Sequence, residues 1–246
     1  MVLSALPGGL LGARQGNPPA TVVALHGWQR SHADFDAVLA GLDAVAPDLP
    51  GFGATPPPPA AWGSADYAAA VLPLCGEGPP VVLVGHSFGG KVAATLAAAH
   101  PERVAALVLT GAPVLRPADQ ARPRASLAHR LARGLHRAGL ISDARMEARR
   151  RRAGSDDYRA AEGAMRDVLV RSIAEMDDGT YRRALGALRC PVELVWGERD
   201  TAAPPAVAHE AAALVADARV TILPGIGHLT PTDAPAELRA AIDRHR

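Results

Sequence analysis

The chain has 246 residues and a net charge of +1, and 48% of its residues are hydrophobic. That length and composition predict one large globular domain and exclude an intrinsically disordered chain. No apolar run approaches the roughly 20 residues that cross a bilayer, and no early basic region precedes the first apolar stretch, so we expect neither membrane insertion nor a signal peptide. The two cysteines, Cys75 and Cys190, lie far apart in sequence, which favours free thiols and a cytoplasmic location.

Short apolar segments alternate with helical patterns through most of the chain, which is typical of a parallel sheet with crossover helices. A leading hairpin is expected around residues 7–9. Strands are predicted over residues 21–25, 44–46, 81–84, 106–109, 192–195 and 220–223. Helices are predicted over residues 34–42, 65–74, 87–100, 206–215 and 234–244. The predicted fold class is therefore α/β, with a mostly parallel central sheet flanked by helices.

The strand pattern stops after residue 112 and resumes only at residue 190. The segment between them is predicted to contain basic amphipathic helices, for example over 126–139 and 158–176, and no strand stands out in it. We therefore predict a core of residues 1–112 and 190–246, with a helical cap inserted over residues 113–189. Ligands of open α/β sheets bind beyond the carboxyl ends of the strands, so this cap would roof the site.

The run Gly-His-Ser-Phe-Gly at residues 85–89 follows an apolar strand pattern and precedes an alanine-rich helix pattern. This order is typical of a sharp strand-to-helix turn with Ser87 at its apex. Glycines flank the serine because side chains at 85 and 89 would collide across the turn. The helix N-terminus presents free N–H groups and a partial positive charge to a developing oxyanion. Ser87 is thus the candidate nucleophile.

A serine hydroxyl needs a neighbouring base to take its proton and a third group to orient that base. His228 lies in a glycine-rich loop beyond the last predicted strand, and Asp200 follows the strand before it. Ser87, Asp200 and His228 therefore stand in the chain order Ser, Asp, His. Glu198 and Asp233 are nearby carboxylates that could replace the acid, and we prefer Asp200.

Acyl transfer also needs hydrogen-bond donors for the tetrahedral oxyanion. We predict the backbone N–H groups of Phe88 and Trp28, since Gly27 lets the Trp28 loop approach closely. The rings of Trp28 and Phe88 are expected to contact substrate at the mouth of the site. We expect His26 to hold the loop and His86 to be a packing neighbour rather than a second base.

The net charge conceals a segregation along the chain. Residues 112–190 contain 17 arginines and 10 acidic residues, whereas the remainder has 9 basic and 15 acidic residues. A solvated helical face is one interpretation of this excess. The alternative is a surface that steers an anionic substrate or an acidic carrier protein, with Arg149 and Arg152 in contact with the substrate. Nucleic acid is disfavoured, because the segment lacks interleaved aromatic residues.

Together these motifs resemble the α/β-hydrolase family. The matching segments are residues 26–28 (HGW), 48–53 (DLPGFG), 85–89 (GHSFG), 196–200 (WGERD) and 227–228 (GH). The core is most similar to serine esterases of the pimeloyl carrier-protein methyl ester esterase type, while the cap does not obviously match them. The resemblance implies a catalytic triad of Ser87, Asp200 and His228, and a structural role for residues 48–53. Some members carry the acid after the sixth strand, but residues 110–113 contain no carboxylate, which favours Asp200.

The predicted function is a serine hydrolase that cleaves a carboxylic ester through an acyl-enzyme. We expect no cofactor and no metal, because the histidines and cysteines show no ligand-like spacing. A thioesterase, an amidase or a carbon–carbon bond hydrolase with the same triad stays open, since specificity lies in the cap and pocket. A non-catalytic small-molecule receptor on the same fold is the alternative from a different class.

Overall fold

The computed structural model describes residues 2–116, 135–136, 140–142, 145 and 156–246. The strands in this part of the chain are β1 (Val2–Ala5), β2 (Leu11–Gln15), β3 (Val22–Leu25), β4 (Ala44–Asp48), β5 (Val81–His86), β6 (Val104–Thr110), β7 (Val192–Gly197) and β8 (Ala218–Leu223). They form one sheet in the order β1-β2-β4-β3-β5-β6-β7-β8. β2 is antiparallel to β1 and β4, and the other neighbours are parallel.

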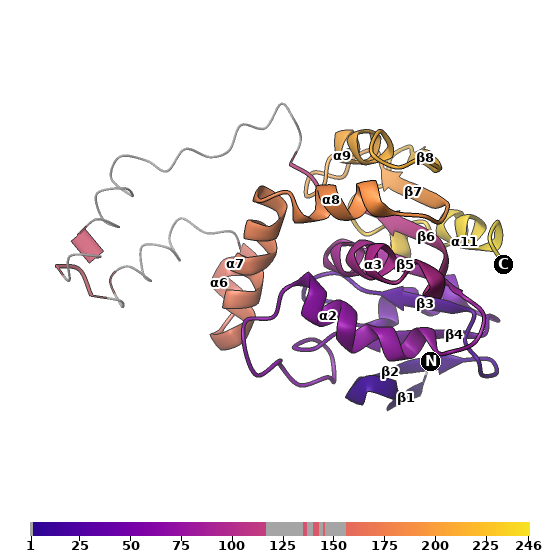
Figure 1. The fold of residues 1–246 in the computed structure, drawn as a ribbon, viewed down its shortest axis with the longest axis horizontal. Coiled ribbons are helices and arrows are strands. Elements are labelled where there is room, and N and C mark those ends of the chain that lie inside the picture. The colour runs from indigo at the N-terminus through magenta and orange to yellow at the C-terminus, as the bar shows by residue number, and fades with distance from the viewer. Residues whose placement is uncertain (1, 117–134, 137–139, 143–144, 146–155) are drawn as a thin grey trace.

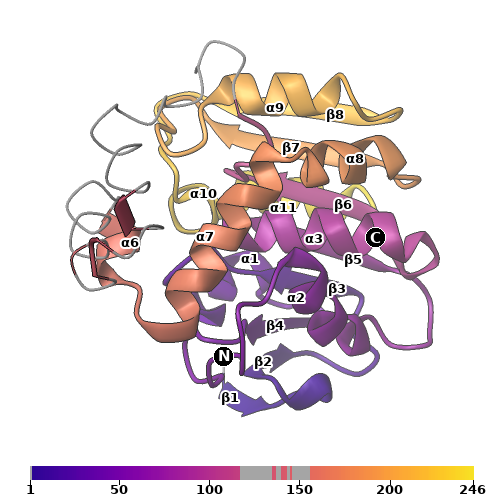
Figure 2. The same ribbon diagram turned by 60° about the vertical axis from the view of Figure 1, so that its left-hand side comes forward.

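Helices cover both faces of this sheet, with α2, α3 and α8 on one face and α1 and α11 on the other (Figures 1 and 2). The helices described are α1 (Asp36–Leu39), α2 (Ser64–Val71), α3 (Phe88–Ala99), α6 (Asp156–Ala160), α7 (Gly163–Asp177), α8 (Thr180–Ala187), α9 (Pro205–Ala212), α10 (Thr230–Asp233) and α11 (Pro235–Asp243). α6 and α7 lie toward the end of the sheet to which the parallel strands point (Figure 2). None of the described helices is long and apolar enough to cross a membrane.

The core is split into two hydrophobic clusters by the sheet, and β3 shows why. Val23 and Leu25 face the cluster that contains α2, α3 and α8, whereas Val22 and Ala24 face the cluster of α1 and α11. Because helices cover both faces, successive strand residues are all buried, and the strand has no polar face. This explains the continuous apolar runs of the sequence, and the predicted α/β fold class is confirmed.

The structure also corrects part of the sequence interpretation. The single helix predicted over 158–176 is wrong, because α6 ends at Ala160 and α7 begins at Gly163. Between them Glu162 is extended, with φ −127° and ψ 156°, and Gly163 has a left-handed φ of 51°. The leading hairpin is confirmed as β1 and β2. Most of the helix predicted over 126–139 lies outside the described residues.

Lys91, the only lysine of the chain, lies on α3 and is buried against α7 and α8. Its Nζ donates to Ser172 Oγ at 2.9 Å and lies 5.4 Å from the centre of the Tyr181 ring. The Tyr181 hydroxyl in turn donates to Glu175 at 2.9 Å. Burial lowers the pKa of Lys91 to about 8, although the nearby Glu175 carboxylate opposes this shift. This network joins the helix that follows Ser87 to α7 and α8.

The low pKa of Lys91 predicts a pH-dependent stability. Because the ordinary pKa of 10.5 is higher than the folded value of about 8, the unfolded chain binds the proton more tightly. The destabilising contribution of Lys91 is therefore fully present below pH 8 and shrinks as the pH rises toward 10.5. We expect the free energy of unfolding of Lys91→Met, measured relative to wild type, to fall by roughly 2 to 3 kcal/mol between about pH 7 and pH 10.

Denaturant unfolding of both proteins at several pH values measures this difference. The subtraction removes the titration of other groups that both proteins share. A difference that stays constant across this interval would contradict the buried, charged state assigned to Lys91.

Candidate active site

Ser87 lies at the turn between β5 and α3 in a strained left-handed conformation, with φ 51° and ψ −115°. A Cβ at Gly85 would lie 2.6 Å from the backbone of α3, and a Cβ at Gly89 would overlap the end of β3. The predicted reason for the two flanking glycines is therefore confirmed. The serine lies at the carboxyl end of β5, and ligands of parallel sheets bind at this end of the strands.

The structure places Ser87, His228 and Asp200 in hydrogen-bonding contact. His228 Nε2 lies 3.1 Å from Ser87 Oγ, and His228 Nδ1 lies 2.8 Å from Asp200 Oδ2. Asp200 is 3% exposed, and its Oδ1 accepts from the amides of Ala202 and Ala203 at 2.9 and 2.8 Å. The carboxylate therefore accepts a hydrogen bond from the protonated Nδ1. The unprotonated Nε2 is then free to accept a hydrogen bond from the serine hydroxyl. That tautomer is the one a general base needs.

The other two candidate carboxylates have different partners. Glu198 Oε2 accepts from the amide of Gly225 at 2.9 Å, so it holds the loop that carries His228. The exposed Asp233 carboxylate accepts from the Thr232 hydroxyl at 3.1 Å. Within the described part of the chain, the carboxylate bonded to His228 is that of Asp200.

Two further histidines support the site without facing the nucleophile. His26 Nδ1 donates to the carbonyl of Gly27 at 2.7 Å, and its Nε2 accepts from the amide of Leu49 at 2.9 Å. His86 Nε2 donates to the carbonyl of His228 at 2.9 Å. Burial lowers the pKa of both rings, that of His86 to about 4. These neutral rings hold the Leu49 and His228 loops, in agreement with the expected supporting roles.

The predicted oxyanion donors, Trp28 and Phe88, follow the ends of the adjacent strands β3 and β5. Trp28 follows β3 and precedes Gln29, which has a φ of 54°. Gln29 and Ser87 are the two non-glycine residues with positive φ among the described residues. The amide of Gly89 donates to the carbonyl at the end of β3, whereas no backbone acceptor in the described chain is bonded to the amides of Trp28 and Phe88. Strain concentrated at a site of this kind is typical of functional backbone.

The scarce aromatic residues gather beside the serine. Five of the nine Phe, Tyr and Trp residues contact one another through their rings, with centroids between 4.8 and 5.9 Å apart. These five residues, the aromatic cluster, are Trp28, Phe52, Trp62, Tyr67 and Phe88. Phe88 is 5% exposed, and its ring packs inside the cluster, so its predicted contact with substrate stays a prediction. Trp28, in contrast, lines a cavity.

That cavity, here called the Trp28 cavity, has a volume of about 290 Å³. It is lined by Trp28, Gln29, Gly51, Phe52, Ala160, Ala161, Glu162 and Met165. Its wall is mostly apolar, and Glu162 is the charged residue among those that line it. Sequence reasoning missed the contributions of Glu162 and Met165, because it placed both inside one continuous helix.

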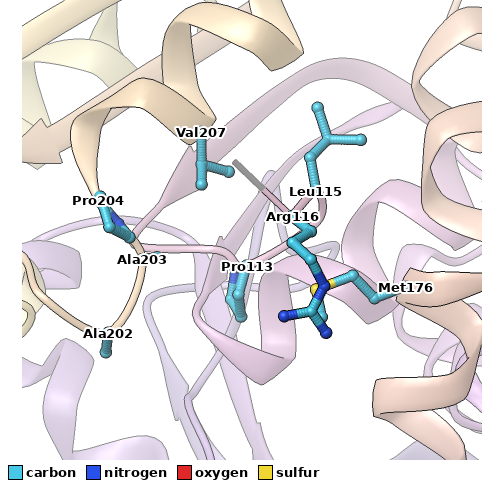
Figure 3. A pocket seen from close by; sticks show the side chains of 8 residues that line it. All are labelled: Pro113, Leu115, Arg116, Met176, Ala202, Ala203, Pro204 and Val207. Atoms are coloured by element: carbon cyan, nitrogen blue, oxygen red, sulfur yellow. The ribbon is translucent and has the colours of Figure 1, made fainter. Parts of the chain in front are cut away.

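A second cavity, here called the Arg116 cavity, has a volume of about 130 Å³ (Figure 3). It is lined by Pro113, Leu115, Arg116, Met176, Ala202, Ala203, Pro204 and Val207. No sequence pattern singles out Arg116, because it is one arginine among many. Arg149 and Arg152, which were predicted to contact substrate, lie outside the described residues.

The cysteines offer no competing nucleophile. Cys75 and Cys190 are buried free thiols, as expected. Burial raises the pKa of both thiols, that of Cys75 to about 11, so they are protonated and unreactive near neutral pH. Over the residues that the structure describes, no group of three or more His, Cys, Asp or Glu side chains is arranged to hold a metal ion.

Comparison with known proteins agrees with this geometry at the level of the family. Residues 22–241 match the model of the alpha/beta hydrolase family, and the chain therefore belongs to that family of enzymes. The predicted family, fold class and enzyme assignment are confirmed.

Individual relatives carry esterase and lipase names. The chain is 32% identical to the pimeloyl-[acyl-carrier protein] methyl ester esterase of Aromatoleum aromaticum, over 90% of this chain and 96% of that protein. It is 45% identical to the lipase LipV of Mycobacterium tuberculosis over 102 residues, 37% of this chain and 36% of that protein. An esterase structure from Thermogutta terrifontis matches with a TM-score of 0.67 at 24% identity, covering 98% of this chain and 95% of that one. This last likeness concerns the fold alone.

Gly111 provides a test of the Asp200–His228 geometry. It has a φ of 54°, and a Cβ there would lie 3.1 Å from both Asp200 Oδ2 and His228 Nδ1. Gly111→Ala is expected to destabilise the backbone by about 1 kcal/mol and to displace the two partners. We therefore expect Ser87 to react with a fluorophosphonate more slowly, by on the order of tenfold.

A matched control separates crowding from backbone strain. Gly41 has a φ of 73°, and a Cβ there would meet no atom within 4 Å. Gly41→Ala should lose a similar stability and label at the wild-type rate. Equal labelling of the two variants would contradict the role given to the space at Gly111.

Proposed function

We propose that this enzyme is a serine esterase in which Ser87 is the nucleophile, His228 the general base and Asp200 the orienting acid. The observation that carries the proposal is the continuous hydrogen-bond chain from Ser87 through His228 to Asp200, at 3.1 and 2.8 Å. Ser87 Oγ attacks the ester carbonyl carbon while His228 Nε2 takes its proton. The Asp200 carboxylate stabilises the imidazolium that forms, and the proton then passes to the leaving alcohol. An acyl group is left on Ser87.

The second half of the reaction repeats these steps with water. His228 removes a proton from a water molecule, which attacks the acyl carbon, and the proton returns to Ser87 as the acid leaves. In both halves the amides of Trp28 and Phe88 donate to the oxyanion. One such donor contributes on the order of 10² to 10³ to the rate in enzymes of this kind.

The nature of the bond and the acyl group is supported by the relatives. We favour an ester over a thioester, an amide or a carbon–carbon bond because a relative matched over 96% of its length is named a methyl ester esterase. The name of that relative also supports an acyl group bound to a carrier protein. The Trp28 cavity, with its apolar wall, suits the acyl chain.

The inserted segment is part of this proposal. We propose that residues 113–189 form a cap over the core, as the sequence indicates. Ala160, Ala161, Glu162 and Met165 support this role, since they line the Trp28 cavity together with residues of the core loops. α8 also contributes to the core, because Tyr181 and Leu185 are buried in the main core cluster. The buried free thiols accord with a cytoplasmic location.

Removal of the nucleophile tests the mechanism. Ser87→Ala should abolish both the turnover of acyl esters and labelling by a fluorophosphonate, because the attacking oxygen is gone. A panel of esters that vary in chain length, with matched thioesters and amides, identifies the preferred bond in the wild type. Labelling that persists in Ser87→Ala would overturn the assignment. Single-turnover labelling of the wild type without steady-state release would favour a receptor.

The steering hypothesis for the basic cap has a separate test. Charge reversal of three of the arginines from Arg149 to Arg152 should raise KM for a carrier-bound or anionic ester and spare a neutral short-chain ester. Because steering acts through charge, the difference should shrink as the salt concentration rises. If both substrates respond alike, these arginines do not steer the substrate.

A further inference from the structure

The Arg116 cavity lies next to the acid of the site. Ala202 and Ala203 line the cavity, and their amides hold Asp200 Oδ1 at 2.9 and 2.8 Å. Pro113 also lines the cavity and follows Gly111 by two residues, and Gly111 adjoins the Asp200–His228 pair. A group bound in this cavity would therefore lie beside the residues that hold the Asp200 carboxylate.

Among the side chains that line this cavity, Arg116 is the one charged group and the others are apolar. Figure 3 shows the guanidinium of Arg116 between Pro113 and Met176, with Ala203, Pro204 and Val207 on the other side. The Arg116 side chain is 24% exposed. A cation beside an apolar wall is screened less than one in water, so it attracts an anion more strongly.

The ion pair of Arg116 leaves donor capacity unused. Its Nε and Nη2 both donate to the same oxygen, Asp177 Oδ1, at 3.2 and 3.0 Å. A guanidinium has five N–H donors and binds a carboxylate best with two oxygens in a fork. The structure gives Nη1 of Arg116 no acceptor among the described residues. Asp177 therefore holds the guanidinium in place without saturating it.

The two cavities differ in charge. Glu162 is the charged residue of the Trp28 cavity, and Arg116 is the charged residue of the Arg116 cavity. An anionic group is repelled by the first and attracted by the second. A neutral, apolar chain gains from the larger volume of the Trp28 cavity, at about 290 Å³ against about 130 Å³. The pair of cavities would thus sort the two parts of a substrate by charge.

We propose that the Arg116 cavity binds an anionic group of the substrate, a carboxylate or a phosphate, with Arg116 as its counter-ion. Asp177 is the internal competitor that positions Arg116 when the cavity is empty. The inference rests on the proposed esterase function and narrows it to esters that carry a negative charge a short distance from the scissile bond.

Paired substrates test this selectivity. One pair carries the charge on the alcohol side, 4-carboxyphenyl acetate against phenyl acetate. The other carries it on the acyl side, 4-nitrophenyl hydrogen adipate against its neutral methyl ester. The quantity measured is the ratio of kcat/KM for the anionic and the neutral member of each pair. Arg116→Gln should lower this ratio by about tenfold in one of the pairs, which identifies the half of the substrate that occupies the cavity.

Two further variants sharpen the result. Asp177→Asn should raise the same ratio, because the competing carboxylate is neutralised. Arg183→Gln, which removes an exposed α8 arginine outside the cavity, should leave the ratio unchanged. If Arg116→Gln changes neither ratio, or changes it no more than Arg183→Gln does, the proposal is wrong.

A binding measurement keeps this test independent of turnover. Phenylphosphonate is an anion that cannot be hydrolysed as an ester, and calorimetric titration gives its Kd. Arg116→Gln should weaken binding by about tenfold relative to wild type. An equal Kd for the two proteins overturns the anion site. Ester turnover that survives in Ser87→Ala overturns the assignment of Ser87 as nucleophile alone, and a wild type that hydrolyses no ester overturns the esterase function alone.

Discussion

The site depends on the close approach of the backbone at the Ser87 turn to the neighbouring strand ends, which requires glycine at several positions. The left-handed turn at this serine carries a strain of about 1 to 2 kcal/mol, which the surrounding structure must hold. The amide of Ser87 donates to Thr110 on one side at 3.0 Å, and that of Gly89 donates to His26 on the other at 3.1 Å. A Cβ at Gly27 would lie 3.2 Å from Ser87 Cβ, so the close approach at Ser87 also constrains the loop that carries Trp28.

The close packing around Ser87 also determines which ring nitrogens of His228 and His86 carry a proton. The Asp200 carboxylate fixes the proton of His228 on Nδ1, and the carbonyl of His228 fixes the proton of His86 on Nε2. The two rings lie 4.9 Å apart. Because burial lowers the pKa of His86 to about 4, His86 stays neutral and adds no positive charge beside His228. In the proposed mechanism the imidazolium of His228 therefore faces the Asp200 carboxylate without a competing cation.

What the sequence predicted well is what depends on short-range rules. β5 and the turn at Ser87 follow from an apolar run and two glycines, and the loops of Asp200 and His228 follow from their places after the last two strands. The break between α6 and α7 was missed because the helical periodicity continues across it, and the left-handed φ of Gly163 is invisible in the pattern. Arg116 was missed because facing a cavity is a property of tertiary packing rather than of charge.

Lys91 shows how packing overrides composition. Every other basic residue of the chain is arginine. A guanidinium stays charged at any pH a protein tolerates and needs several acceptors, whereas an ammonium is compact and loses its proton when buried. Among the described residues, Lys91 Nζ donates to one acceptor, Ser172 Oγ, and the face of the Tyr181 ring lies beside it. An arginine there would leave several donors unsatisfied in the core, one helical turn from the nucleophile. The rare lysine thus stands where α3 must pack tightly enough to hold Ser87 in its strained turn.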